Sequence, residues 1–195
     1  MSVRIYKLGG SGNSGVLGVH SLVKIDSTQN TSQSLNALTL VNHSTTLNAV
    51  KTAPYIPNQN IDANTFFIYV TSPSSGNLAR IMVYSDLNGL PDNLLYSSID
   101  LSLTGGGIKT TPKAGFSFVA GTTYWLAVQV NTGSAGLHGI PLGSLLPISN
   151  NSTDGNAYSV YSALGTYASG AQASFSLYTS PTYTTDSMPF VGITA

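Results

Sequence analysis

Residues 78–91 read LARIMVYSDLNGLP, and residues 116–130 read FSFVAGTTYWLAVQV. The first stretch begins with an apolar run, interrupted only by Arg80, and ends in the turn-forming pair Asn88-Gly89. The second stretch places the only tryptophan, Trp125, after an Ala-Gly-Thr turn signal. Apolar runs of strand length that bracket such turns are typical of neighbouring β-strands. We therefore predict an all-β protein, an antiparallel β-sandwich of the jelly-roll type.

The composition also favours strands over helices. The chain has 195 residues, of which 42% are hydrophobic and only 7% are charged, and it contains no Glu. A surface helix relies on pairs of Glu with Lys or Arg at i,i+4, which this chain cannot supply. Its formal net charge is zero and it has no basic cluster, which argues against nucleic acid and against an anionic membrane surface as partners.

The sequence also disfavours other classes of protein. Without cysteine the chain has no disulfide and no thiolate metal site. The first residues do not have the form of a signal peptide, and no apolar stretch has the length of a membrane span. We expect no cofactor, no metal and no catalytic residue.

The pattern divides the chain into three parts. Residues 1–34 are expected to form an N-terminal arm and linker, residues 35–180 the β-sandwich domain, and residues 181–195 an extended C-terminal tail. Within the sandwich we predict strands at 37–40, 46–54, 65–70, 79–84, 94–101, 107–111, 124–130, 157–161 and 174–178. Residues 66–70 and 124–128 are the best core candidates. A long loop rich in Gly, Pro, Ser and Asn is predicted over residues 137–156.

The arm is too short and too rich in glycine to fold alone, so its apolar side chains need cover. They can pack on the sandwich or on a neighbouring subunit, and we favour the neighbour. At about 25 cal/mol per Å² of apolar area, several such side chains would stabilise an assembly substantially. The candidate contact residues are Val3, Ile5, Tyr6, Leu8, Val16, Leu17 and Val19.

Two motifs have a functional and a structural interpretation. Residues 10–15 fit the spacing G-x-G-x-x-G, but a dinucleotide site needs a following helix, and residues 16–25 lack helix formers. We interpret this glycine run as a hinge. Asp86, Asn88, Asp92 and Asn93 could present oxygen atoms to Ca²⁺. A β-turn in which Asp86 accepts a hydrogen bond from its own backbone accounts for the same residues, and we favour it.

Histidine and aromatic residues raise binding hypotheses. His20, His43 and His138 lie far apart without the spacing of a zinc site. Trp125 lies between apolar neighbours, so core packing is favoured over sugar stacking. The tyrosines near the C-terminus could line a subunit interface or a glycan site. The candidate surface-recognition residues are His138, Tyr158, Tyr161, Tyr167 and Tyr183.

A resemblance extends this interpretation. The series Arg80-Ile81-Met82-Val83-Tyr84-Ser85-Asp86, Asn88-Gly89-Leu90-Pro91, Leu94-Leu95 and Gly121-Thr122-Thr123-Tyr124-Trp125-Leu126-Ala127 resembles a β-sandwich domain of bacteriophage structural proteins. Such domains occur in tail fibres, in other appendages and as lone exterior proteins, and similar sandwiches occur in carbohydrate-binding modules. The resemblance covers roughly residues 50 to 180, while the two ends match no pattern that we can name.

The resemblance implies a non-enzymatic role on the exterior of a virion, often as a homotrimer. Our leading hypothesis is a head decoration or cement protein that contacts its own copies and other virion proteins, such as the major capsid protein. The alternative is a receptor-binding domain of a tail fibre, spike or baseplate that recognises host-surface carbohydrate. A small hydrolase is a third class, but none of the seven Asp residues stands in a recognisable catalytic context.

Overall fold

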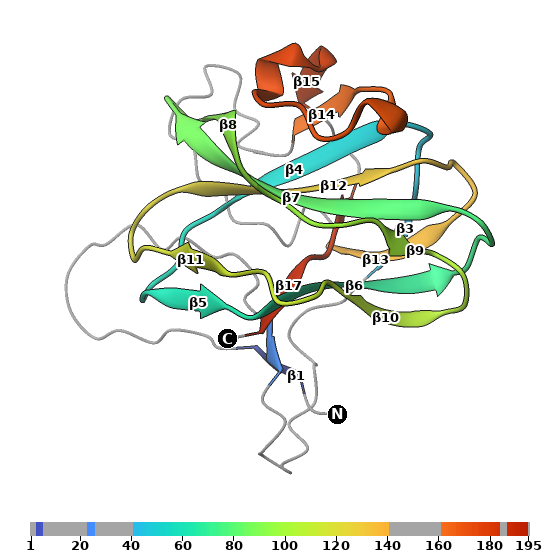
Figure 1. Ribbon diagram of the computed structural model, residues 1–195, viewed down its shortest axis with the longest axis horizontal. Coiled ribbons are helices and arrows are strands. Elements are labelled where there is room, and N and C mark those ends of the chain that lie inside the picture. The colour runs from blue at the N-terminus through green and yellow to red at the C-terminus, as the bar shows by residue number, and fades with distance from the viewer. Residues whose placement is uncertain (1–2, 6–22, 26–40, 141–160, 184–186, 195) are drawn as a thin grey trace.

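The computed structural model describes residues 3–5, 23–25, 41–140, 161–183 and 187–194. Within these ranges the chain forms an antiparallel β-sandwich, which confirms the predicted fold class. Two sheets, A and B, lie face to face, with sheet B above sheet A in Figure 1. The described residues also contain two short 3-10 helices, η2 (Tyr167–Ser169) and η3 (Phe175–Leu177). None of their helices is long and apolar enough to cross a membrane.

Sheet A is built around β6 (Thr65–Ser72). One edge of β6 pairs with β10 (Gly107–Thr110), and the other pairs with β13 (Gly136–Ile140) and β17 (Gly192–Thr194). β13 pairs in addition with β3 (Val41–Ser44) and β16 (Met188–Pro189). Beyond β17 the sheet continues through β2 (Val23–Ile25) to β1 (Val3–Ile5).

Sheet B contains the first of the two stretches that decide the fold, residues 78–91, and the part of the second at 124–130. Its strand order is β15 (Thr179–Tyr183), β14 (Tyr161–Leu164), β4 (Ala49–Tyr55), β12 (Tyr124–Val130), β7 (Leu78–Leu87) and β8 (Leu90–Ser97), and β9 (Leu101–Ser102) also pairs with β7. β5 (Ile61–Ala63) and β11 (Phe116–Phe118) form a separate two-stranded sheet. The turn between β7 and β8 has Asn88 at φ 56° and Gly89 at φ 80°. Two left-handed residues in succession match the twist of a hairpin, so Asn-Gly suits this turn.

The main core lies between the sheets. Alternate residues of β7 and β12 point into it, among them Ala79, Ile81, Leu126 and Val128. The same cluster contains Phe66, Ile68 and Val70 of β6, none more than 1% exposed. Period-two alternation therefore assigns one set of side chains on each central strand to this core.

The outer face of sheet B is buried as well. Val50, Met82, Tyr84, Trp125 and Ala127 point away from sheet A and form a second apolar cluster. Ala163 of β14 belongs to the same cluster. Residues 165–178, which we call the cap, cover the cluster with Phe175 and Tyr178, and in Figure 1 they lie in the orange part of the chain at the top of the molecule. Because both faces of β7 and β12 are covered, their sequences are continuous apolar runs. The core position predicted for Trp125 is confirmed, since it is 1% exposed.

Most predicted strands of the sandwich are present. Those at 46–54, 65–70, 79–84, 107–111 and 124–130 correspond to β4, β6, β7, β10 and β12, and the one at 94–101 is divided between β8 and β9. The strand predicted at 37–40 lies outside the described residues, as does the one at 157–161 except for Tyr161.

Three expectations differ from the structure. Residues 174–178 contain η3 in place of a strand, because Phe175 and Tyr178 turn inward to cover sheet B. The loop predicted at 137–156 begins as strand β13, and residues 141–156 lie outside the described part of the chain. The predicted C-terminal tail supplies β16 and β17 to sheet A, where Val191 and Ile193 belong to the core.

Candidate functional site

The turn predicted at Asp86 is formed as expected. The backbone N–H of Gly89 donates to Asp86 Oδ2 at 3.1 Å, and the indole Nε1 of Trp125 donates to Asp86 Oδ1 at 2.8 Å. One carboxylate therefore closes the hairpin turn and binds the neighbouring strand. This arrangement gives a structural reason for Asp86, Gly89 and Trp125 to occur together.

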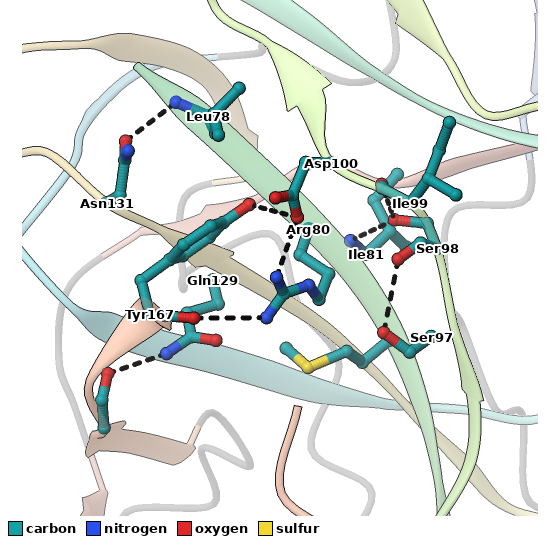
Figure 2. Close-up of polar contacts among 12 residues, drawn as sticks. Leu78, Arg80, Ile81, Ser97, Ser98, Ile99, Asp100, Gln129, Asn131 and Tyr167 are labelled. Atoms are coloured by element: carbon teal, nitrogen blue, oxygen red, sulfur yellow. Dashed lines mark hydrogen bonds and ion pairs between the residues drawn. The ribbon is translucent and has the colours of Figure 1, made fainter. Parts of the chain in front are cut away.

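Arg80, the one basic residue of β7, is part of a polar cluster with the cap (Figure 2). Its Nη2 donates to Asp100 Oδ1 at 2.8 Å, and its guanidinium lies 4.5 Å from the centre of the Tyr167 ring. The Tyr167 hydroxyl donates to the same Asp100 oxygen at 2.8 Å. Burial and the adjacent Asp100 carboxylate raise the pKa of Tyr167, so it remains a hydrogen-bond donor. The cluster thus fixes η2 to sheet B.

The predicted recognition residues lie in different places. Tyr167 is 7% exposed and packs on Arg80 in the cap, which leaves little of it for surface recognition. Tyr161 and Tyr183 are cross-strand neighbours in the β14–β15 pair, and Tyr158 lies outside the described residues. His138 lies on β13 in sheet A, away from the cap on sheet B.

The histidines do not converge. His20 lies outside the described residues. His43 pairs with Leu137, a core residue, and is 4% exposed, with Nδ1 at 2.8 Å from the Ser187 hydroxyl. His138, the next residue after Leu137, points to the opposite, outer face of sheet A. Across the described segments, no group of three or more His, Cys, Asp or Glu side chains is placed to hold a metal ion.

His43 and Lys51, both at most 5% exposed, line a small pocket between the sheets. Val128, Leu137 and Pro189 contribute to its wall, and its volume is about 10 Å³. That is the space of a single water molecule, whereas pockets for small ligands are commonly about 300 Å³ or more. This pocket is therefore too small for a sugar or a nucleotide.

A row of side chains on the outer face of sheet A offers more surface. Tyr69 on β6 is 38% exposed, and its ring centre lies 4.4 Å from that of His138 at an interplanar angle of 46°. Asn42 on β3 is the cross-strand neighbour of His138, and Thr71 donates a hydrogen bond to Asn42 Oδ1. On the other side, Ile108 of β10 is the cross-strand neighbour of Tyr69. We call Ile108, Tyr69, His138 and Asn42, with Thr71, the outer row.

Sequence reasoning identified only His138 of this row. Residues 66–70 were predicted as core throughout, but Tyr69 faces outward. Every residue of that run is apolar or aromatic, so the alternation between the two faces is hidden. The other members come from separate strands, and only the pairing of β3, β13, β6 and β10 brings them together.

The arm contributes two short strands to the sandwich. Val3 and Ile5 lie on β1, which pairs with β2, and β2 meets β17 through the single parallel pair Ile193 and Lys24. In Figure 1, β1 projects below sheet A near β17. The other candidate contact residues (Tyr6, Leu8, Val16, Leu17 and Val19) and the glycine run at 10–15 lie outside the described residues. In this single chain, the described parts of the arm therefore extend the chain's own sheet.

Comparison with known proteins adds no relative. A scan against models of protein families finds no match, and a search of curated proteins finds no similar sequence.

Proposed function

We propose that this chain is a non-enzymatic structural protein of a bacteriophage particle, an exterior head decoration or cement protein. Its N-terminal strands would join neighbouring copies, as in a homotrimer, and the assembly would lie against other virion proteins such as the major capsid protein. The observation that carries the proposal is the position of β1 at the end of sheet A.

An end strand is suited to such a contact. Within the described residues β1 has one strand neighbour, β2, so one row of its backbone N–H and C=O groups lacks a strand partner there. Such an edge can pair with a strand of another chain. β2 pairs with β17 through one register pair, so few backbone hydrogen bonds have to break for these two strands to pair elsewhere.

The surface chemistry agrees with a permanent place in an assembly. The chain has seven basic and seven acidic residues in 195, so copies repel one another little. The described residues of the sandwich form two buried clusters, one on either face of sheet B, which give the contact a packed scaffold.

Removal of the arm tests the proposal. A chain lacking residues 1–15 should keep the far-UV circular dichroism and the melting temperature of the sandwich to within a few degrees, but should fail to form oligomers or to attach to particles. Light scattering and incorporation into particles measure these properties. Particles without the protein should lose their contents sooner under heat or osmotic stress.

Point variants of the full chain sharpen this test. Val3→Asp and Ile5→Asp place charges on β1, whereas Leu47→Asp places one on an exposed leucine (57%) in the β3–β4 turn. We expect the β1 variants to weaken assembly and the control to have no effect. Normal incorporation of the truncated chain and of both β1 variants would overturn the arm contact.

A second candidate function is a receptor-binding domain of a tail fibre, spike or baseplate. The outer row favours it, because an exposed tyrosine ring beside uncharged polar groups suits a carbohydrate ligand. Saturable binding to host cells by the isolated protein would support this candidate over a purely cementing role.

A further inference from the structure

The outer row is a continuous strip across four strands. Ile108, Tyr69, His138 and Asn42 come in turn from β10, β6, β13 and β3. Tyr69 and His138 face outward because Ile68, Val70 and Leu137 beside them point into the core. Ile108 and Asn42 share that face as their cross-strand neighbours. Tyr69 is the most informative member. It is the one tyrosine among the exposed large hydrophobic residues for which the structure describes the burial of the side chain.

The rings of Tyr69 and His138 form one surface. Their centres lie 4.4 Å apart, and they are inclined by 46°. This spacing is too short for each ring to hold a separate ligand ring. Tyr69 and His138 thus form a single angled platform, with the more exposed face on Tyr69.

A glycine keeps the surface beside this platform low. A Cβ atom at Gly136 would lie 2.7 Å from both Asn42 Oδ1 and Thr71 Oγ1. Because Gly136 has no side chain, Thr71 can donate its hydrogen bond to Asn42 Oδ1 above β13. The carbonyl of Asn42 is engaged in this way, and its amide nitrogen keeps two hydrogens to donate. The polar groups at the end of the platform are therefore held in place.

We propose that the outer row is a binding site for an uncharged saccharide, with one sugar ring stacked on Tyr69 and its hydroxyl groups bound by His138, Asn42 and Thr71. Aromatic faces attract the polarised C–H groups of a sugar ring, while amide, hydroxyl and imidazole groups match its hydroxyls. The proposal deepens the second candidate function and does not depend on the arm contact.

The charge of the site selects the class of saccharide. No member of the row carries a formal charge when His138 is neutral. Burial lowers the pKa of His138, which favours the neutral imidazole at pH 7. Its Nδ1 is buried and has no hydrogen-bond partner within the described structure. An acidic polysaccharide would find no cation in the row, so a neutral one is the better match.

Binding by the full chain tests the proposal. An array of neutral and acidic bacterial surface glycans gives the first survey, followed by calorimetric titration with soluble hexaoses of glucose, mannose and N-acetylglucosamine. We expect saturable binding to at least one neutral glycan. Tyr69→Ala and His138→Ala should each weaken that affinity about tenfold or more, because each removes part of the platform.

Two further variants separate stacking from folding. Tyr69→Phe keeps the ring and should bind within about threefold of the original chain. Leu177→Ala removes an exposed leucine (63%) from η3, over the opposite face of the sandwich, and should leave binding unchanged. Thermal melts of all four variants check that each is folded.

Several outcomes would overturn the site. They are the absence of binding to any neutral glycan, equal affinity of the original chain and Tyr69→Ala, or binding restricted to acidic glycans. The β1 variants Val3→Asp and Ile5→Asp should bind saccharide normally while their assembly is weakened. Failure of the saccharide site is thereby distinguished from failure of the arm contact.

Discussion

The two sheets of this sandwich differ in what lies over their outer faces. On sheet B the cap covers Met82, Tyr84 and Trp125, so both faces of the central strands are buried. On sheet A the outer face keeps Tyr69 38% exposed and His138 half-buried. A sheet that is covered on both faces contributes mainly to stability, whereas aromatic rings exposed on one face of a sheet are available for binding. We therefore expect sheet B to supply the scaffold, and we propose the outer face of sheet A as the binding surface.

The largest expected effect is on the sheet B side. Trp125→Ala removes the largest buried side chain of the second cluster and its hydrogen bond to Asp86. We expect it to lower the free energy of unfolding by about 4 kcal/mol, through lost burial and the cavity left behind. Urea unfolding followed by circular dichroism measures the change.

The matched substitution on sheet A is Tyr69→Ala, which should lower the free energy of unfolding by only about 1 to 2 kcal/mol, because that ring is 38% exposed. Similar losses for the two variants would contradict the division between scaffold and recognition face. A large loss for Tyr69→Ala alone would assign the outer row to the core and remove it as a binding surface.

A smaller effect is expected where the cap joins sheet B. Tyr167→Phe removes the hydroxyl that donates to Asp100 and keeps the ring that packs on Arg80. Since the Asp100 side chain is 37% exposed, we expect a loss of about 1 kcal/mol, below the range for fully buried bonds to charged groups. A double-mutant cycle with Asp100→Asn isolates this contact. A coupling energy near zero would show that apolar packing alone holds the cap.

The same comparison explains how far the sequence could predict the molecule. β7, β12 and the Asn88-Gly89 turn were predictable, because a continuous apolar run and an Asn-Gly pair have one common meaning in β proteins. The cap was not. A three-residue 3-10 helix such as η3 has no periodicity to detect, and its apolar residues look like those of a strand.

β16 and β17 were not predictable either, because they are two and three residues long, too short for an alternating pattern. The candidate site was still less predictable than the fold. The outer row depends on strand register, since Tyr69, His138 and Asn42 are neighbours only after β3, β13 and β6 have paired. Register follows from the packing of whole sheets and is not encoded in any one stretch. Residue types alone indicated His138, without its neighbours.

The smallest expected effect is a pH dependence that belongs to sheet A. Burial lowers the pKa of folded His138 below its usual value near 6.5. Above that value neither the folded nor the unfolded chain protonates this ring, so it makes no pH-dependent contribution to stability. As the pH falls below about 6.5, the unfolded chain binds the proton first, and stability decreases until the folded ring is protonated too.

Urea unfolding at several pH values between 7.5 and 5 measures this effect. Over that range the free energy of unfolding should fall further in the original chain than in His138→Gln, whose side chain does not bind a proton. The two chains differ only at residue 138, so the difference between them reports His138 itself. An identical pH dependence for both would mean that the ring is as well solvated in the folded chain as in the unfolded one, which would contradict the burial that favours a neutral imidazole in the outer row.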